Sequence, residues 1–335
     1  MLIGTGDFVF EWHEPFIDFP YAEDALEGWA HHGLTVMANG NLLSCHPSRP
    51  LLLVCDTQGA VIRTVDLPVT EIHGLTTVTE AGGESIWIVD NGRKREKKAG
   101  YDYVQGSEKA RAVKVSRSGD IELELGPPPL KNYASGTFSP TQVAVWSKSD
   151  GGNDEIWLAD GYGEHQIHCY DSNGDYVSSI NSSKSPAGSF NNPHGIWIDT
   201  RKAEAELYIA DRANAQIQVY SLDGQFKRNF GTDFLLKPSA FAPYGDYLLI
   251  ADLCGRLTVL DLDDALVCHL GDNHQVAREP GWPNSLNLQG QPIRTDRLRA
   301  GAFNSPHSVT CDAQGNIYVC EWLIGGRFIK LVKTQ

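Results

Sequence analysis

The sequence predicts an all-β protein: a ring of six four-stranded units, or six-bladed β-propeller. Residues 192–231 show the clearest unit, in which four short apolar runs are separated by Asp, Gly and Asn, as in an antiparallel meander. The same order of runs returns along the chain at intervals of roughly 40–50 residues, the period of propeller blades. Residues 8–12 alternate as a strand would, yet no unit precedes them. This lone strand is free to complete the last unit.

Each unit has the same internal order. It opens with a strand of the form Pro/x-His-x-apolar, continues with an apolar run that ends in an acidic residue, and finishes with an outer hairpin. In the first unit, His46 takes the place of the acid. The opening strands are expected at residues 30–36, 72–76, 138–143, 192–199, 237–241 and 305–309. The sixth unit has only three strands before the chain ends, so the strand at 8–12 is expected to close the ring. The whole chain, 1–335, is then a single domain.

Two insertions interrupt the repeat. A basic segment at about 93–111 lies inside the second unit, and a polar segment at about 268–300 separates the fifth unit from the sixth. The first insertion is most simply a solvated loop, and its length also suits a lid over a site.

Composition excludes several classes of function. Hydrophobic residues make up 41% and charged residues 21% of the 335 residues, which is ordinary for a globular protein with a large core. A net charge of −14 argues against a nucleic-acid surface, because phosphate contacts need basic side chains. No apolar run approaches the ~18 residues of a membrane span, and no signal segment follows Met1. Seven cysteines without a C-x-x-C pair suit a reducing compartment, so we expect a cytoplasmic protein.

The opening strands also predict a metal site. First strands of propeller blades surround the central channel, so their matching residues form a ring at one end. That ring consists of His32, His73, the Thr141-Gln142 pair, His194, Ser239 and His307. His73, His194 and His307 belong to alternate blades, about 120° apart, and three converging imidazoles with an open fourth position are typical of catalytic zinc. Alternatively, the ring nitrogens bond to backbone. His32 is a fourth candidate ligand or a capping side chain beside the channel.

Non-repeated residues on the same face are candidates for chemistry. The acids that end the second strands recur too regularly to be catalytic and are expected to bond turn amides. Tyr162, Arg212 and Arg49 do not recur. A phenol and guanidinium groups beside a metal suit a substrate that carries a carboxylate, and a tyrosine near a cation can move protons. The alternative is that these are ordinary surface residues.

These residues resemble the catalytic domain of peptidylglycine alpha-amidating enzymes, the peptidyl-α-hydroxyglycine alpha-amidating lyase, within the wider NHL-repeat propellers. The resemblance spans roughly residues 30–332. Its specific parts are the segments 72–75, 139–145, 159–162, 190–194, 210–214 and 303–307.

The resemblance implies a role for each matching residue. His73, His194 and His307 match the ligands of Zn²⁺, in whose place another divalent transition metal could bind. Tyr162 matches the catalytic tyrosine, and Arg212 matches an arginine near the substrate. The arginine that follows a family histidine at position 46 is displaced here, so Arg49 is a less direct match. Such lyases cleave an N-acyl-α-hydroxyglycine into an amide and glyoxylate.

One departure concerns a second metal. The family places an aspartate, a ligand of structural Ca²⁺, directly after the last zinc histidine, and this chain has Ser308 there. A hydroxyl replaces that negative charge poorly, so we do not expect structural calcium.

The sequence supports three functional hypotheses. The first is a metal-dependent lyase that acts on a small carboxylated substrate. The second is a non-enzymatic NHL-repeat scaffold that binds a protein partner and for which the histidines are dispensable. The third is a hydrolase of the lactonase type, which ranks last because such enzymes hold calcium with carboxylate and asparagine ligands, whereas this ring supplies imidazoles.

Overall fold

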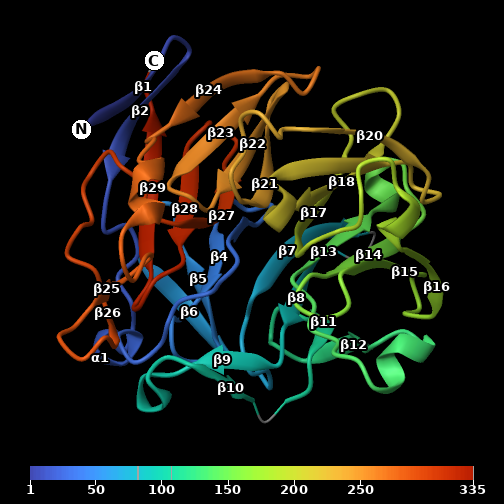
Figure 1. The fold of residues 1–335 in the computed structure, drawn as a ribbon, viewed down its shortest axis with the longest axis horizontal. Coiled ribbons are helices and arrows are strands. Elements are labelled where there is room, and N and C mark those ends of the chain that lie inside the picture. Colours follow the sequence, from blue (N-terminus) through green and yellow to red (C-terminus); the bar gives the residue numbers. More distant parts are fainter. Residues whose placement is uncertain (81–82, 107, 335) are drawn as a thin grey trace.

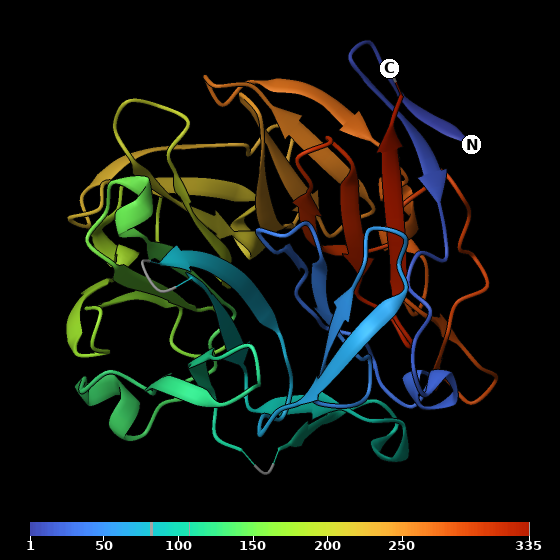
Figure 2. The same ribbon diagram turned by 180° about the vertical axis from the view of Figure 1, so that it is seen from behind.

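The computed structural model describes residues 1–80, 83–106 and 108–334 and is an all-β ring of six blades (Figure 1). Each blade is one antiparallel sheet, and the first strands of neighbouring blades contact one another around the central axis. Figure 2 shows the same ring from behind, with both chain ends beside one blade. The predicted fold class is confirmed.

The first three blades follow one another along the chain. Blade one consists of β3 (Thr35–Val36), β4 (Leu42–Cys45), β5 (Leu51–Cys55) and β6 (Val61–Asp66). Blade two consists of β7 (Gly74–Glu80), β8 (Gly83–Asp90), β11 (Arg111–Val115) and β12 (Ile121–Leu125). Blade three consists of β13 (Gln142–Trp146), β14 (Glu155–Asp160), β15 (Gln166–Tyr170) and β16 (Tyr176–Ile180).

Blades four and five repeat this order, and the N-terminus closes blade six. Blade four consists of β17 (Pro193–Asp199), β18 (Glu206–Asp211), β19 (Gln216–Tyr220) and β20 (Phe226–Phe230). Blade five consists of β21 (Pro238–Tyr244), β22 (Tyr247–Asp252), β23 (Arg256–Leu260) and β24 (Leu266–Leu270). Blade six consists of β27 (Pro306–Cys311), β28 (Ile317–Glu321), β29 (Arg327–Lys333), β2 (Phe8–His13) and β1 (Leu2–Thr5). In the seam, Phe10 lies opposite Lys333 and Trp12 opposite Leu331, as the unpaired strand predicted.

The insertions carry small elements of their own. The first holds a hairpin of β9 (Arg93–Arg95) and β10 (Tyr103–Gln105), joined through the 3₁₀ turn η1 (Lys97–Ala99). The second begins later than predicted, because residues 266–270 are paired with β23 as strand β24. It contains η6 (His274–Arg278), β25 (Ser285–Leu286) and β26 (Pro292–Ile293). The remaining short helices are α1 (Ala22–Ala25), η2 (Lys131–Ala134), η3 (Lys148–Asp150), η4 (Ser182–Lys184) and η5 (Arg212–Asn214). In the described part of the chain, no helix is long and apolar enough to cross a membrane.

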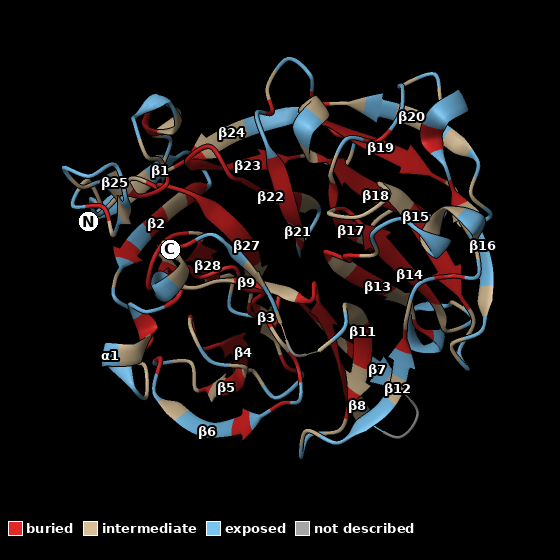
Figure 3. Cartoon of the chain, turned by 60° about the horizontal axis from the view of Figure 1, so that its bottom comes forward, coloured by how far each residue is buried: buried red, intermediate tan, exposed pale blue. Residues whose placement is uncertain are grey.

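The core lies between neighbouring sheets. Phe10, Val259 and Leu331 are fully buried in one cluster that joins blade five to blade six. Figure 3 shows the inner and middle strands buried and the outer strands largely exposed. The inner strands are therefore held by packing on both sides, which fixes the side chains at their ends.

The acids that end the second strands clamp the loops that lead into the first strands. Asp90 accepts hydrogen bonds from the backbone N–H groups of Thr70 (2.7 Å) and Glu71 (3.2 Å). Equivalent bonds run from Ser139 to Asp160, from Asn191 to Asp211, from Lys237 to Asp252 and from Ser305 to Glu321. The prediction that these acids bond backbone amides is confirmed. Each clamp holds the backbone two to three residues before a position of the predicted histidine ring.

A part-buried ionic network braces the outer edge of blades four and five. Arg228 donates two hydrogen bonds to Glu206 (2.9 and 2.7 Å) and two to Asp264 (3.0 and 2.7 Å). Tyr208 donates a further bond to Asp264 (2.7 Å). Burial would raise the pKa of Glu206, but the hydrogen bonds from Arg228 and Lys227 outweigh burial and lower that pKa to about 2.

We expect Arg228→Met to lower the free energy of unfolding by about 2 kcal/mol at pH 7, because two carboxylates lose a charged partner. The pKa of Glu206 is lower in the folded chain than its ordinary value of 4.5. Its contribution is therefore present above that value and is lost as the pH falls toward 2. Urea unfolding at pH 7 and at about pH 3 measures both effects. The exposed Lys131→Met is the control, and equal stability of the two variants at pH 7 would contradict the prediction.

Candidate metal centre

Four buried histidines converge at one end of the central channel. One ring nitrogen from each of His31, His73, His194 and His307 lies within 4.8 Å of the other three. They come from blades one, two, four and six. His194 and His307 are the second residues of β17 and β27, and His73 directly precedes β7. The three histidines of the predicted alternate-blade set are thus brought together.

The fourth imidazole belongs to His31, whereas the sequence analysis proposed His32. The His32 ring stacks on Phe328, with ring centroids 5.1 Å apart and an interplanar angle of 19°. Its Nε2 is buried without a hydrogen-bond partner. Side chains of adjacent residues in non-helical backbone tend to point in opposite directions, so only one of this pair faces the axis.

The backbone fixes the orientation of three of the rings. Nδ1 of His73 lies 2.7 Å from the carbonyl oxygen of Thr141, and Nδ1 of His194 lies 2.8 Å from that of Ser239. Nδ1 of His307 bonds to the carbonyl oxygen of His32 at 3.1 Å. A carbonyl only accepts, so each Nδ1 carries the proton and each Nε2 presents a lone pair to the axis. The alternative of backbone-bonded rings therefore holds for one nitrogen of each ring and leaves the other available to a ligand.

Glycines allow this close approach between blades. A Cβ on Gly74 would lie 2.7 Å from the carbonyl oxygen of Thr141, and one on Gly195 would lie 2.7 Å from that of Ser239. These are the same carbonyls that bind the preceding histidines. A side chain at either position would push the carbonyl away from the imidazole.

The Tyr162 hydroxyl contacts three of the four imidazoles. Its oxygen is 2.8 Å from Nε2 of His31, 3.0 Å from Nε2 of His194 and 3.3 Å from Nε2 of His73. Nε2 of His31 and Nε2 of His73 are only 3.2 Å apart. The lone pairs of His73 and His194 both face this hydroxyl, and its single proton can satisfy only one of them. A cation among them would remove the conflict, and the residues therefore fit a metal.

Burial keeps the imidazoles neutral. It lowers the pKa of His73 to about 4 and the pKa of His31, His194 and His307 well below the ordinary value. Neighbouring cations, Arg212 among them, act in the same direction. Burial also raises the pKa of Tyr162, and the charge of Arg212 opposes that rise. Unprotonated imidazole is the form that binds a metal.

A buried carboxylate supports the fourth imidazole. Oε2 of Glu71 lies 3.5 Å from Nδ1 of His31, and Oε1 accepts a hydrogen bond from Lys94 at 3.2 Å. Asn91 donates to Oε2 at 3.3 Å. In many metal sites, the second ring nitrogen of a histidine ligand donates to such a carboxylate. His31 thus differs from the other three rings, which rest on backbone carbonyls.

The two predicted arginines lie in different places. Nη2 of Arg212 donates to the Tyr162 hydroxyl at 3.3 Å, so Arg212 belongs to the cluster. Arg49 forms an exposed ion pair with Asp24, and its guanidinium lies over the ring of Tyr21. The structure does not bring Arg49 to the imidazoles, because the turn that carries it faces the N-terminal linker instead.

The sequence analysis missed His31, Glu71 and Lys94. The doubled histidine at 31–32 was a signal for the first, since either residue could face the axis. No sequence pattern indicated the pairing of Glu71 with Lys94, because it joins the loop before β7 to the insertion after β8.

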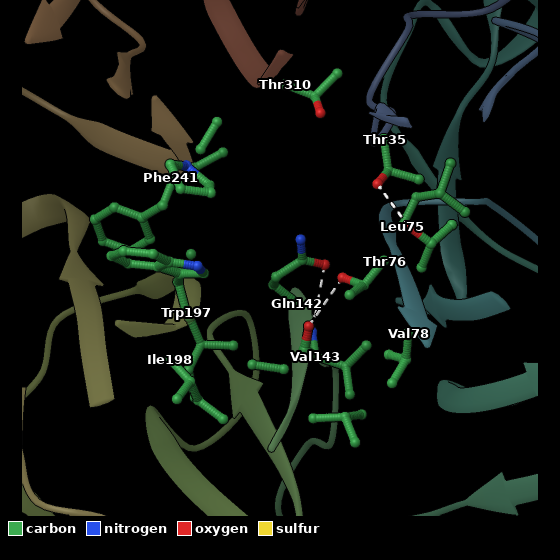
Figure 4. A pocket seen from close by; sticks show the side chains of 18 of the residues that line it. Thr35, Leu75, Thr76, Val78, Gln142, Val143, Trp197, Ile198, Phe241 and Thr310 are labelled. Carbon is green, nitrogen blue, oxygen red and sulfur yellow. Dashed lines mark hydrogen bonds between the residues drawn. The ribbon is translucent and has the colours of Figure 1, made fainter. Parts of the chain in front are cut away.

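A wide cavity lies further along the same channel. It has a volume of about 430 Å³ and extends to the far ends of the inner strands, where Trp197, Phe241 and Thr310 line it (Figure 4). A much smaller space touches His73, His194 and His307, and Gln142 lines both. The two spaces thus share a lining residue, and Gln142 lies between the wide cavity and the imidazoles.

Comparisons with known proteins agree with this architecture. A family described as a 6-bladed beta-propeller, DUF5128, matches residues 149–254. NHL repeat-containing protein 3 of Homo sapiens and that of Mus musculus are each 27% identical over 218 residues. Each match covers 63% of this chain and 58% of the relative, so the chain matches less than two thirds of these proteins. The NHL-repeat level of the resemblance is supported.

Solved structures show the same fold at low identity. Virginiamycin B lyase from Staphylococcus aureus has a TM-score of 0.56 at 13% identity, covering 96% of this chain and 99% of its own. A gluconolactonase from Xanthomonas campestris has a TM-score of 0.57 at 13% identity, covering 96% of each chain. These likenesses support the six-bladed propeller fold of the chain.

We expect Glu71→Ala to lower the free energy of unfolding by about 3 kcal/mol, because it leaves the buried Lys94 ammonium without its partner. Lys94→Met in the same chain should recover much of that loss. Chemical denaturation of both single variants and the double variant measures the coupling. Additive losses would contradict the inferred ion pair.

Proposed function

We propose that the protein is a metal-dependent lyase that cleaves the C–N bond of a small N-acyl-α-hydroxyglycine-like substrate to an amide and glyoxylate. The observation that carries this proposal is a cluster of four neutral imidazoles, three of which contact the Tyr162 hydroxyl, with an arginine beside it. One small molecule could then contact a metal held by the imidazoles, a tyrosine that carries a proton and an arginine that binds a carboxylate.

His31, His73, His194 and His307 would hold a divalent transition metal, and imidazole suits zinc, copper, iron and nickel. Such an ion supplies Lewis acidity toward the α-hydroxyl oxygen of the substrate. Zinc with four protein ligands is usually closed to substrate. His31 is the imidazole best able to yield a position, because its Nδ1 faces the Glu71 side chain and not a backbone carbonyl.

The chain's own residues account for substrate orientation and for the proton. The planar guanidinium of Arg212 suits a two-point pair with the substrate carboxylate. Tyr162 would accept the proton of the α-hydroxyl as the carbonyl of glyoxylate forms. It would donate its own proton to the nitrogen that leaves as the C–N bond breaks, so that protons balance. The half-buried position of Tyr162 limits competition from bulk water for this transfer.

The metal is tested by elemental analysis of the purified protein. We expect about one transition-metal ion per chain in the wild type and none in the His73/His194/His307 triple alanine variant, with the propeller still folded by circular dichroism. His13→Ala, on the exposed face of β2, is the matched control and should retain the metal. Absence of metal from the wild type after reconstitution would reject the lyase and favour the protein-binding scaffold.

Tyr162→Phe tests the proton carrier. We expect the variant to keep its metal and to lose glyoxylate release from α-hydroxyhippurate by about 10²-fold or more, the usual contribution of a general acid–base. Glyoxylate is measured directly in the supernatant. Turnover equal to the wild type would remove Tyr162 from the mechanism, whereas loss of the metal would assign it to the ligand set.

A further inference from the structure

Two more arginines lie close to the residues of the imidazole cluster. Arg93 and Arg95 are the first and last residues of β9, so they point to the same side of the strand, opposite to Lys94. Nη2 of Arg93 donates to the backbone oxygen of Tyr162 at 3.4 Å. Arg93 therefore binds one end of the same tyrosine whose hydroxyl receives a bond from Arg212.

Aromatic rings surround Arg95. Its guanidinium carbon lies 4.3 Å from the ring centroid of Trp29 and 4.5 Å from that of Tyr103. Trp29 packs on Trp322 with centroids 5.2 Å apart, and Trp322 lies 6.2 Å from the ring of His31. A continuous aromatic wall thus connects Arg95 to the cluster.

The three guanidiniums are left with unused donors. Each carries five N–H groups. Arg93 and Arg212 each make one side-chain hydrogen bond, in both cases to Tyr162, and Nε of Arg95 is buried without a partner. Within the described residues, no carboxylate lies within 4.0 Å of any of the three. These guanidiniums therefore carry positive charge that no carboxylate of the described residues neutralises directly.

The three guanidinium charges lie in one part-buried region, so they repel one another unless anions lie between them. Arg212 alone accounts for the substrate carboxylate in the proposed function. Arg93 and Arg95 therefore have capacity for another anionic group, and the exposed ring of Tyr103 lies beside Arg95.

We propose that Arg93 and Arg95 form a second anion-binding subsite, so that the substrate is dianionic, with an acidic group on its acyl side. The inference rests on the proposed function for the position of the first carboxylate. The second group is a carboxylate or a phosphate, either of which a guanidinium fork binds at two points. The insertion after β8 is then the element that selects the acyl group.

Binding of simple acids by isothermal titration calorimetry tests the subsite. The probes are dicarboxylates from malonate to adipate, each beside the monocarboxylate of the same chain length, and an alkyl phosphate that carries one carboxylate. At least one dianion should bind about tenfold more tightly than its monoanionic match, the size expected of one partly buried charge-assisted pair. Preference for the phosphate or for the dicarboxylate identifies the second group.

Variants test whether arginines of the insertion after β8 cause the preference for dianions. Arg95→Gln and Arg93→Gln should each reduce dianion binding toward the monoanion level and leave monoanion binding unchanged. Arg212→Gln should weaken both. Arg95→Lys keeps the charge on the aromatic wall and should retain part of the preference, which guards against loss through misfolding. The exposed Arg278→Gln is the control and should change nothing.

The outcomes separate this inference from the proposed function. Equal binding of dianions and monoanions, or a preference that survives both Arg93→Gln and Arg95→Gln, would overturn the subsite. Glyoxylate release from a neutral N-acyl-α-hydroxyglycine, with no gain from an acidic acyl group, would leave the lyase intact and also reject the subsite. A dianion preference in a protein that binds no metal would support the subsite and reject the lyase.

Discussion

The site depends on one repeated hydrogen bond, from the backbone entering a blade to the acid that ends its second strand. Asp90, Asp211 and Glu321 each anchor the loop that precedes a histidine of the cluster. These carboxylates are buried, and their bonds to amides replace the water that they lose. A motif that serves the fold in most blades therefore serves the cluster in three of them.

Polar groups are distributed unevenly between the two ends of the channel. Around the wide cavity, the hydroxyls of Thr76 and Thr77 donate to backbone carbonyls, so they are satisfied within the fold. At the imidazole end, Nε2 of His73 and Nε2 of His194 both face the Tyr162 hydroxyl. Nε2 of His307 and Nε of Arg95 are buried without a hydrogen-bond partner. The imidazole end thus contains unpaired polar atoms that a bound ligand could meet.

Features set by the repeat could be predicted from the sequence. The ring of blades, its closure by residues 8–12 and the convergence of His73, His194 and His307 all depend on matching positions in successive strands. The choice between His31 and His32 depends on the direction of one side chain in an irregular segment, which periodicity does not specify. Glu71 with Lys94 and the arginines of β9 involve an insertion that has no counterpart in other blades. Arg49 was assigned to the site because its turn belongs to blade one, but a turn sequence does not specify the direction in which a side chain points.

Joining the ring through its two chain ends has a consequence for any ion at the centre. The cluster draws His31 and His73 from the first two blades and His307 from the last, so its members lie on both sides of the seam between β2 and β29. An ion bound there would act as a clasp that links the beginning of the chain to its end. Metal binding would then be thermodynamically linked to closure of the ring. Removal of the metal by a chelator would therefore destabilise even the outermost strand of blade six.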